Sequence, residues 1–214
     1  MDTAECNSQS GQIRTDIAPD GDVILVVGPQ KVRLRVHSQF LRSASKVFAA
    51  MLGPRWNDGR GLSEAHTHEV SLMEDDADAM RTICYVIHLR NDDVPQVIKP
   101  RELLQILIVS DKYDFHLALK YLFKDQLKPR AETKYLFNCH LKPSAESKRV
   151  DMGYLMAAAF LLGNTDVFAV HTLELVLEYK GSFWKFFDDP ITSQIVPMKT
   201  FCMFSNRAPI LVKV

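Results

Sequence analysis

Cysteine is scarce in this sequence of 214 residues, and the four that occur, Cys6, Cys84, Cys139 and Cys202, form no C-x-x-C pair. A secreted domain held together by disulfides carries cysteine more densely in a shorter chain. We therefore expect reduced thiols in an intracellular protein, located in the cytoplasm or the nucleus.

Long apolar runs are also missing. The longest candidate, Leu155 to Leu162, falls short of the roughly 18 apolar residues of a membrane span. The first residues, MDTAECNSQSGQ, are polar and lack the apolar centre of a secretion signal. The pattern predicts neither a membrane anchor nor a leader.

The sequence has no excess of charge of either sign, because 26 Lys and Arg balance 26 Asp and Glu. Such a balance gives no overall attraction to nucleic acid or to an anionic membrane. A basic strand face remains at Lys31, Arg33 and Arg35, which we interpret as solvated, with a phosphate or acidic-peptide patch as the alternative. The aromatic cluster of residues 183–187 favours a core or partner contact over single-stranded nucleic acid.

Catalytic signatures are absent too. The motifs G-x-S-x-G, H-E-x-x-H, G-x-x-x-x-G-K-S/T and G-x-G-x-x-G do not occur. His66 and His68 are separated by one residue and Cys139 directly precedes His140, so these side chains are candidate metal ligands. Neighbours on a chain rarely coordinate one ion together, however. We expect no catalytic residue, no metal site and no cofactor, and therefore a protein that is not an enzyme.

Apolar residues are plentiful, at 47% of the chain, which is enough for a sizeable core. The run Val23 to Val27 is apolar and β-branched, as in a strand buried on both faces. After the turn residues Gly28-Pro29-Gln30, basic and apolar residues alternate from Lys31 to Val36. Period two predicts a half-buried strand, and the two strands together predict a hairpin.

Helical spacing of apolar residues follows the hairpin. Ser38 and Ser45 each precede such a stretch, and their hydroxyls are suited to cap two short helices. After a short strand at residues 69–72, the acidic run Glu74-Asp75-Asp76 suits the positive end of a helix that buries Met80, Ile83, Cys84 and Ile87. Further helices are predicted at residues 100–113, 117–127, 152–162 and 166–179.

Several of these segments, taken in order, resemble the BTB/POZ family. They are Asp22 to Val27 as its opening "D-V" strand, Val36 to Leu41 as "x-H-x-x-x-L", Ser45 to Leu52 as "S-x-x-F-x-x-M-L", Val70 to Met80 as its third strand and acidic cap, and Val109 to Phe115 as "A-D-K-Y" with Ser110 in place of Ala. The likeness covers about residues 16–128. Residues 153–187 are similar to helical extensions that follow the domain in many fungal members.

This resemblance implies an α/β fold of the α+β type, with a small sheet flanked by a cluster of helices and followed by C-terminal helices. It divides the chain into a disordered segment at 1–17, a BTB/POZ domain at 18–128, a linker at 129–150 and a helical extension at 151–214. Order is expected to begin near Asp22. The resemblance also implies a homodimerising adaptor or scaffold, including a substrate adaptor for a cullin-type ubiquitin ligase. The alternative is a transcriptional regulator that recruits corepressors.

Carried over to this chain, the dimer surface includes Asp22, Val23, Leu25, His37, Phe40, Leu41 and Val47. The family's charged pocket pairs an early Asp with a basic residue right after the His, and here Ser38 stands where Lys or Arg is usual. The apolar side chains of the first two helices exceed what a small sheet covers, which favours a partner surface. The alternative is a monomer whose C-terminal helices cover those side chains.

Overall fold

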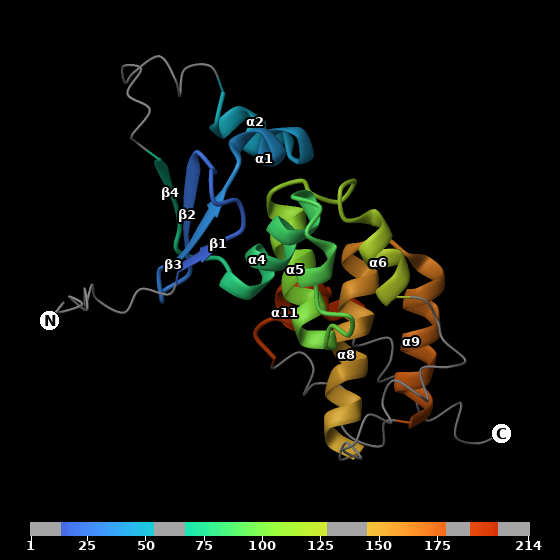
Figure 1. Cartoon of the computed structure of the whole chain (residues 1–214). Coiled ribbons are helices and arrows are strands. Elements are labelled where there is room, and N and C mark those ends of the chain that lie inside the picture. The colour runs from blue at the N-terminus through green and yellow to red at the C-terminus, as the bar shows by residue number, and fades with distance from the viewer. Residues whose placement is uncertain (1–13, 54–66, 128–144, 179–188, 201–214) are drawn as a thin grey trace, which may run out of the picture. The chain divides into compact units, whose positions relative to one another are not determined.

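The computed structural model describes residues 14–53, 67–127, 145–178 and 189–200. The chain divides into two compact units, Met1–Asp93 and Val94–Val214, so the boundary expected near residue 128 lies inside the second unit. The first unit contains a four-stranded sheet with helices, and the second contains helices (Figure 1). The expected mixed α/β class, with a small sheet and several helices, is confirmed.

The sheet has the strand order β1-β3-β2-β4. The predicted hairpin is confirmed, because β2 (Val23–Val27) pairs antiparallel with β3 (Val32–Val36). Strand β4 (His68–Leu72) pairs parallel with β2 on its other side. Four residues of the central strand β2 are buried, and in β3 the apolar residues are buried while the arginines between them are half-buried, as the period of two predicted.

The chain is ordered earlier than expected. Strand β1 (Arg14–Asp16) pairs parallel with β3, and Ile17 and Ala18 are buried. The expectation that order begins near Asp22, and that residues up to 17 are disordered, is therefore wrong for residues 14–17. The strand is short and its side chains are polar, so the energy that holds it comes from pairing with β3 and from the amides of Ile17 and Ala18, which both donate to the Arg35 carbonyl.

Two short helices follow β3, as predicted: α1 (Ser38–Ala44) and α2 (Lys46–Met51). Ser45 is the N-cap of α2, where its Oγ accepts a hydrogen bond from the Phe48 amide at 2.9 Å. Helix α4 (Ala77–Ile87) is capped in the same way by Asp76, which accepts from the Ala79 amide. The predicted stripe of α4 is buried at Met80, Ile83, Cys84 and Ile87, and the 3₁₀ turn η1 (Asn91–Asp93) closes the unit.

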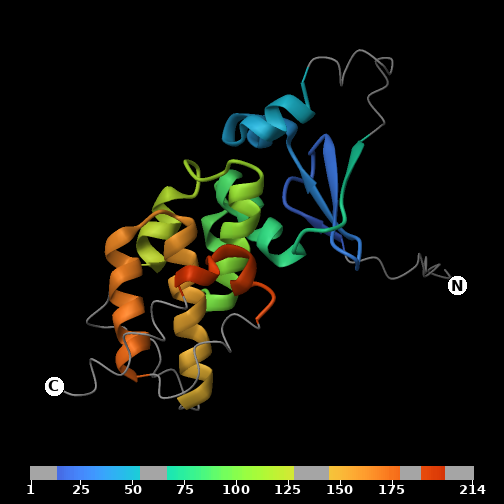
Figure 2. The same cartoon turned by 180° about the vertical axis from the view of Figure 1, so that it is seen from behind.

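The second unit contains α5 (Pro100–Lys112), α6 (Lys120–Gln126), α8 (Ala145–Leu161), α9 (Thr165–Glu178) and α11 (Thr192–Ile195). Helix α8 lies beside α5 and α9, as both views show (Figures 1 and 2). The expected linker at 129–150 is wrong at its end, since α8 begins at Ala145; residues 128–144 lie outside the described part of the chain. Gly163, with φ of 63°, follows the end of α8, where glycine tolerates the left-handed conformation.

Candidate functional site

The acidic residue Asp22, just before β2, binds the first residue of α1. Its Oδ1 accepts a hydrogen bond from the Ser38 amide at 2.7 Å, and its Oδ2 accepts one from the Ser38 hydroxyl at 2.6 Å. Partial burial by itself raises the pKa of Asp22. The two bonds from Ser38 and the nearby His37 lower the pKa by more than burial raises it, so the net pKa is lowered. The ionised carboxylate is therefore the form that this geometry favours.

The contact with Asp22 changes the role expected for Ser38. The N-cap position of α1 is occupied by His37, whose side chain makes no capping bond, and Ser38 is the first helical residue. The prediction that Ser38 caps the helix through its own hydroxyl is therefore wrong. A carboxylate from another part of the chain performs that role, satisfying an amide that has no partner within the helix and placing a negative charge at the positive end of its dipole.

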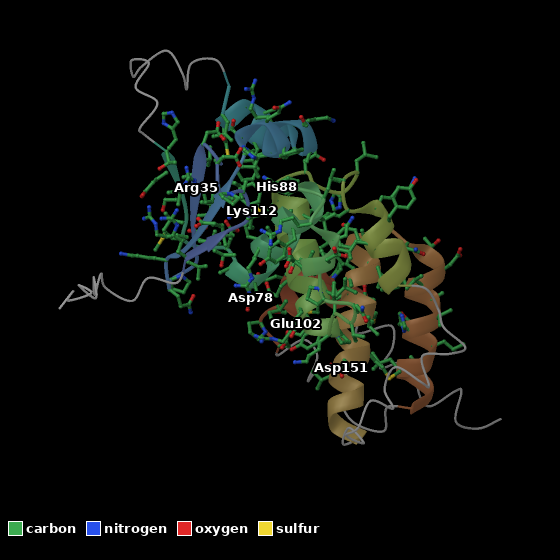
Figure 3. The ribbon with its side chains drawn as sticks, in the orientation of Figure 1. Arg35, Asp78, His88, Glu102, Lys112 and Asp151 are labelled. Atoms are coloured by element: carbon green, nitrogen blue, oxygen red, sulfur yellow. The ribbon has the colours of Figure 1, made fainter. Side chains whose placement is uncertain are left out.

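Three rings lie together next to this cap. The Phe40 ring on α1 contacts the His88 ring with centroids 4.8 Å apart, and the His37 ring lies 5.9 Å from Phe40 and 6.1 Å from His88. His88 directly follows α4 and belongs to the first unit; its side chain is labelled in Figure 3. The ring cluster thus joins the end of α4 to the start of α1, and we call Phe40, His37 and His88 the ring cluster below.

Both nitrogens of His88 are engaged. Its Nε2 accepts a hydrogen bond from the His37 backbone amide at 3.0 Å. Its Nδ1 lies 2.8 Å from the Cys84 carbonyl oxygen, which only accepts, so Nδ1 carries the proton. Burial lowers the pKa of His88; the bond to Cys84 opposes this shift, and the charges of His37 and Arg90 add to it. The site therefore holds His88 as a neutral imidazole in one tautomer.

The turn after α4 is unusual. Leu89 has φ of 60° and its side chain is 75% exposed, although this left-handed region suits glycine far better than leucine. The next residue, Arg90, donates from its Nη1 to the carbonyls of Asp16 and Ile17, and pairs through Nε with Asp93 at 2.7 Å. These bonds hold the turn to the end of β1, while the apolar Leu89 within it stays exposed.

The structure separates the seven residues expected at the dimer surface into two groups. Val23, Leu25 and Leu41 are 1%, 0% and 0% exposed, because they form the core between the sheet and the helices of their own chain. They are therefore not accessible on the surface of this chain. The other four remain accessible to differing degrees: Phe40 is 38% exposed, Asp22 is exposed, and His37 and Val47 are half-buried.

The two arginines of the basic strand face have partners within the chain. Arg33 forms an ion pair with Glu69 on β4, and Arg35 donates from Nε to the Gly21 carbonyl at 2.8 Å. Gly21 is required there, because a Cβ would lie 2.4 Å from the Val36 carbonyl oxygen. Two of the three basic side chains thus have partners within the chain, whereas Lys31 is exposed just before β3.

Several other candidates can be placed only in part. His68 lies on β4, whereas His66, Cys139, His140 and residues 183–187 lie outside the described part of the chain. Within the described ranges, no three His, Cys, Asp or Glu side chains gather as metal ligands. Cys84 is fully buried, and burial raises the pKa of its thiol to about 12.

Sequence reasoning missed His88, Asp20 and Arg90. Asp20 lies with Oδ1 3.3 Å from Nε2 of His37. Their contacts join distant segments: the bond from Arg90 to the Asp16 carbonyl connects residues 74 positions apart. The one local signal was weak: Val86 to Arg90 contains no glycine, although Leu89 in this turn adopts a positive φ.

Comparison with known proteins adds no relative. No model of a protein family matches the chain, and no curated protein and no solved structure matches it either. Among the helices of the described residues, none combines the length and the apolar character needed to cross a bilayer.

Proposed function

We propose that this chain is a protein-interaction module whose contact surface is built around Phe40 on α1. The observation that carries the proposal is that Phe40 is 38% exposed while its ring is held against His88 at 4.8 Å. An aromatic side chain that is partly exposed yet already held in place suits an interface anchor. It offers apolar area to a partner and loses little conformational freedom on binding.

The backbone that carries Phe40 is held at two points. Asp22 accepts two bonds from Ser38, and His88 accepts one from the His37 amide, so the residues just before Phe40 are tied to β2 and α4. Leu89, the residue after His88, is exposed in a backbone conformation that is costly for leucine. Strained, exposed residues of this kind often mark functional surfaces.

A second copy of the chain is the partner we favour. The resemblance to the BTB/POZ family supports a symmetric dimer through the first strand region and the first helix, in which one patch is used twice. Because both oxygens of Asp22 bind Ser38, this dimer would rest on Phe40 and its apolar neighbours rather than on a charged pocket. The same resemblance supports an adaptor role, including one for a cullin-type ubiquitin ligase, with corepressor recruitment as the second candidate.

The test is the mass of the full chain in solution, measured by light scattering from low to high micromolar concentration. We expect a dimer for the natural protein and a loss of at least about 2 kcal/mol of dimer stability, or about thirtyfold in Kd, for Phe40→Asp. Phe160→Asp is a matched control, because Phe160 is 39% exposed and contacts one ring, that of Phe168. A monomer at every concentration, or equal losses in the two variants, would contradict the dimer.

The adaptor role needs a separate measurement. Purified cullin N-terminal domain should be retained by the immobilised natural chain and less by Phe40→Asp if the same surface or the dimer is required. Retention of a corepressor fragment in place of the cullin domain would favour the transcriptional alternative. Retention of neither would leave the adaptor role without support.

A further inference from the structure

The ring cluster contains a group whose protonation conflicts with its contacts. His88 accepts the His37 amide at Nε2 and donates to the Cys84 carbonyl at Nδ1. An imidazolium carries a proton on both nitrogens and has no lone pair left to accept a bond. A proton added at Nε2 would therefore face the N–H of His37, and one of the two would have to move.

The amide that would be displaced belongs to the N-cap residue of α1, the helix that carries Phe40. The ring of Phe40 also lies directly against the His88 ring. Protonation of His88 thus acts on the helix by two routes, through the backbone bond at its start and through the ring contact one turn later. The Asp22 bonds to Ser38 would still hold the amino end of α1, and Asp20 would remain beside the His37 ring.

We propose that His88 is a proton-sensitive anchor for α1, so that mild acidification loosens the helix and weakens the contact surface around Phe40. This regulation of the surface rests on the interaction function proposed above. The loosening of α1 itself does not, because it follows from hydrogen bonds within one chain.

The charges around His88 favour its neutral form. Arg90 follows it on the same turn, where it pairs with Asp93 and lies 5.6 Å above the Tyr85 ring. From β3 and α1, the facing group is His37, stacked at 6.1 Å. No ion pair joins His88 to a carboxylate within the described ranges, and the Cys84 carbonyl at Nδ1 is the group described above that favours the charged ring.

The two carboxylates from the segment before β2 are directed elsewhere. Asp20 faces His37, and a protonated His37 would pair with it and stay beside His88 as a second positive charge. Asp22 binds Ser38, and its lowered pKa keeps it ionised in the range where histidines titrate. A response between about pH 7.5 and about pH 5.5 would therefore report on the histidines and not on the Asp22 cap.

The expected size follows from proton linkage. We call α1 closed when His88 accepts the His37 amide and open when this bond is broken. If His88 cannot take up a proton in the closed form and titrates near its ordinary pKa of about 6.5 in the open form, the ratio of open to closed form rises with acid. Relative to high pH, the ratio is about 1.1 times larger at pH 7.5 and about 11 times larger at pH 5.5. The protection of the His37 and Ser38 amides against hydrogen exchange should then fall by up to about tenfold between the two pH values.

The experiment measures this protection by NMR in the full chain, corrected for the intrinsic pH dependence of exchange. The natural protein should lose protection at His37 and Ser38 on acidification, and His88→Gln, which cannot be protonated there, should not. His116→Gln is the control, because His116 lies in the second unit beside Asp111 and should leave the response intact. A natural protein without a response, or a His88→Gln variant that responds equally, would overturn the proposal.

A second measurement needs no variant. The ¹⁵N shifts of the His88 ring should show a protonated Nδ1 and an unprotonated Nε2 at neutral pH, whereas a ring protonated at Nε2 would overturn the proposal. Light scattering at both pH values tests the dimer separately from the His88 anchor. A chain that is monomeric throughout, yet loses amide protection as described, removes the dimer and leaves the anchor. A dimer with unchanged protection removes the anchor and leaves the dimer.

Discussion

Removal of the Asp22 carboxylate should destabilise the first unit by about 2 kcal/mol. The side chain accepts two short bonds from Ser38, at 2.7 and 2.6 Å, and hydrogen bonds to charged groups contribute about 1.5 to 3 kcal/mol each when buried. Asp22 is exposed, so water screens and competes for these bonds, and we take the lower end for the pair. Loss of a helix cap alone costs about 1 kcal/mol.

A double-mutant cycle isolates the side-chain bond. Asp22→Ala removes both bonds, whereas Ser38→Ala removes only the bond from the hydroxyl and should cost about 1 kcal/mol. The double variant should lose about 2 kcal/mol rather than about 3, which gives a coupling energy of about 1 kcal/mol. Asp92→Ala, at an exposed acidic position in η1, controls for the loss of one negative charge and should stay within about 0.5 kcal/mol.

The assay is urea unfolding followed by amide signals of the sheet, so that the first unit is observed separately. With a slope of roughly 2 kcal/mol per molar urea, Asp22→Ala should lower the midpoint by about 1 M. The pKa of Asp22 is lowered in the folded state, so its contribution is present above its unfolded pKa and is lost as pH falls through the folded pKa. A coupling energy near zero, or a deficit of Asp22→Ala that is unchanged in strong acid, would refute the reasoning.

Two serines and one cysteine, Ser45, Ser110 and Cys84, allow further predictions. Ser45→Ala should cost about 1 kcal/mol in urea unfolding, because it removes the buried cap that accepts the Phe48 amide at 2.9 Å. Ser110→Ala should be neutral or stabilising by up to about 1 kcal/mol in the same measurement, because the fully buried Ser110 hydroxyl has no hydrogen-bond partner in the described part of the chain; a loss as large as that of Ser45→Ala would show that the hydroxyl is bonded. Cys84 should resist alkylation at about pH 8 in the native protein and react in urea, as read by peptide mass spectrometry, since burial raises its pKa to about 12; rapid native labelling would contradict its burial.

Interactions that depend on short stretches of sequence were predictable. The alternation from Lys31 to Val36, the cap at Ser45 and the buried stripe of α4 each follow from the spacing of side chains along one element, and all three are confirmed. The same holds for the start of α5, because the helix predicted at residues 100–113 begins at Pro100. In each case one strand or helix supplies both partners or the whole pattern, so no knowledge of distant residues is needed.

Interactions between distant segments were not predictable. Strand β1 is too short and polar to have a pattern of its own and exists because β3 pairs with it. Ser38 has the composition of a cap, yet Asp22 supplies the capping oxygens from 16 residues away. The early residues Val23, Leu25 and Leu41 have the apolar character of an interface, but their burial depends on which elements pack over them.

By itself, the sequence determined the periods of the elements, the position of several caps and the mixed α/β class, because these follow from propensity and from spacing within about one turn or one strand. Only the tertiary structure decided which apolar residues stay accessible and that His88 binds the amide of His37, 51 residues away. The physical reason is that burial and long-range hydrogen bonds are properties of pairs brought together by folding, and no local pattern records the second member of such a pair.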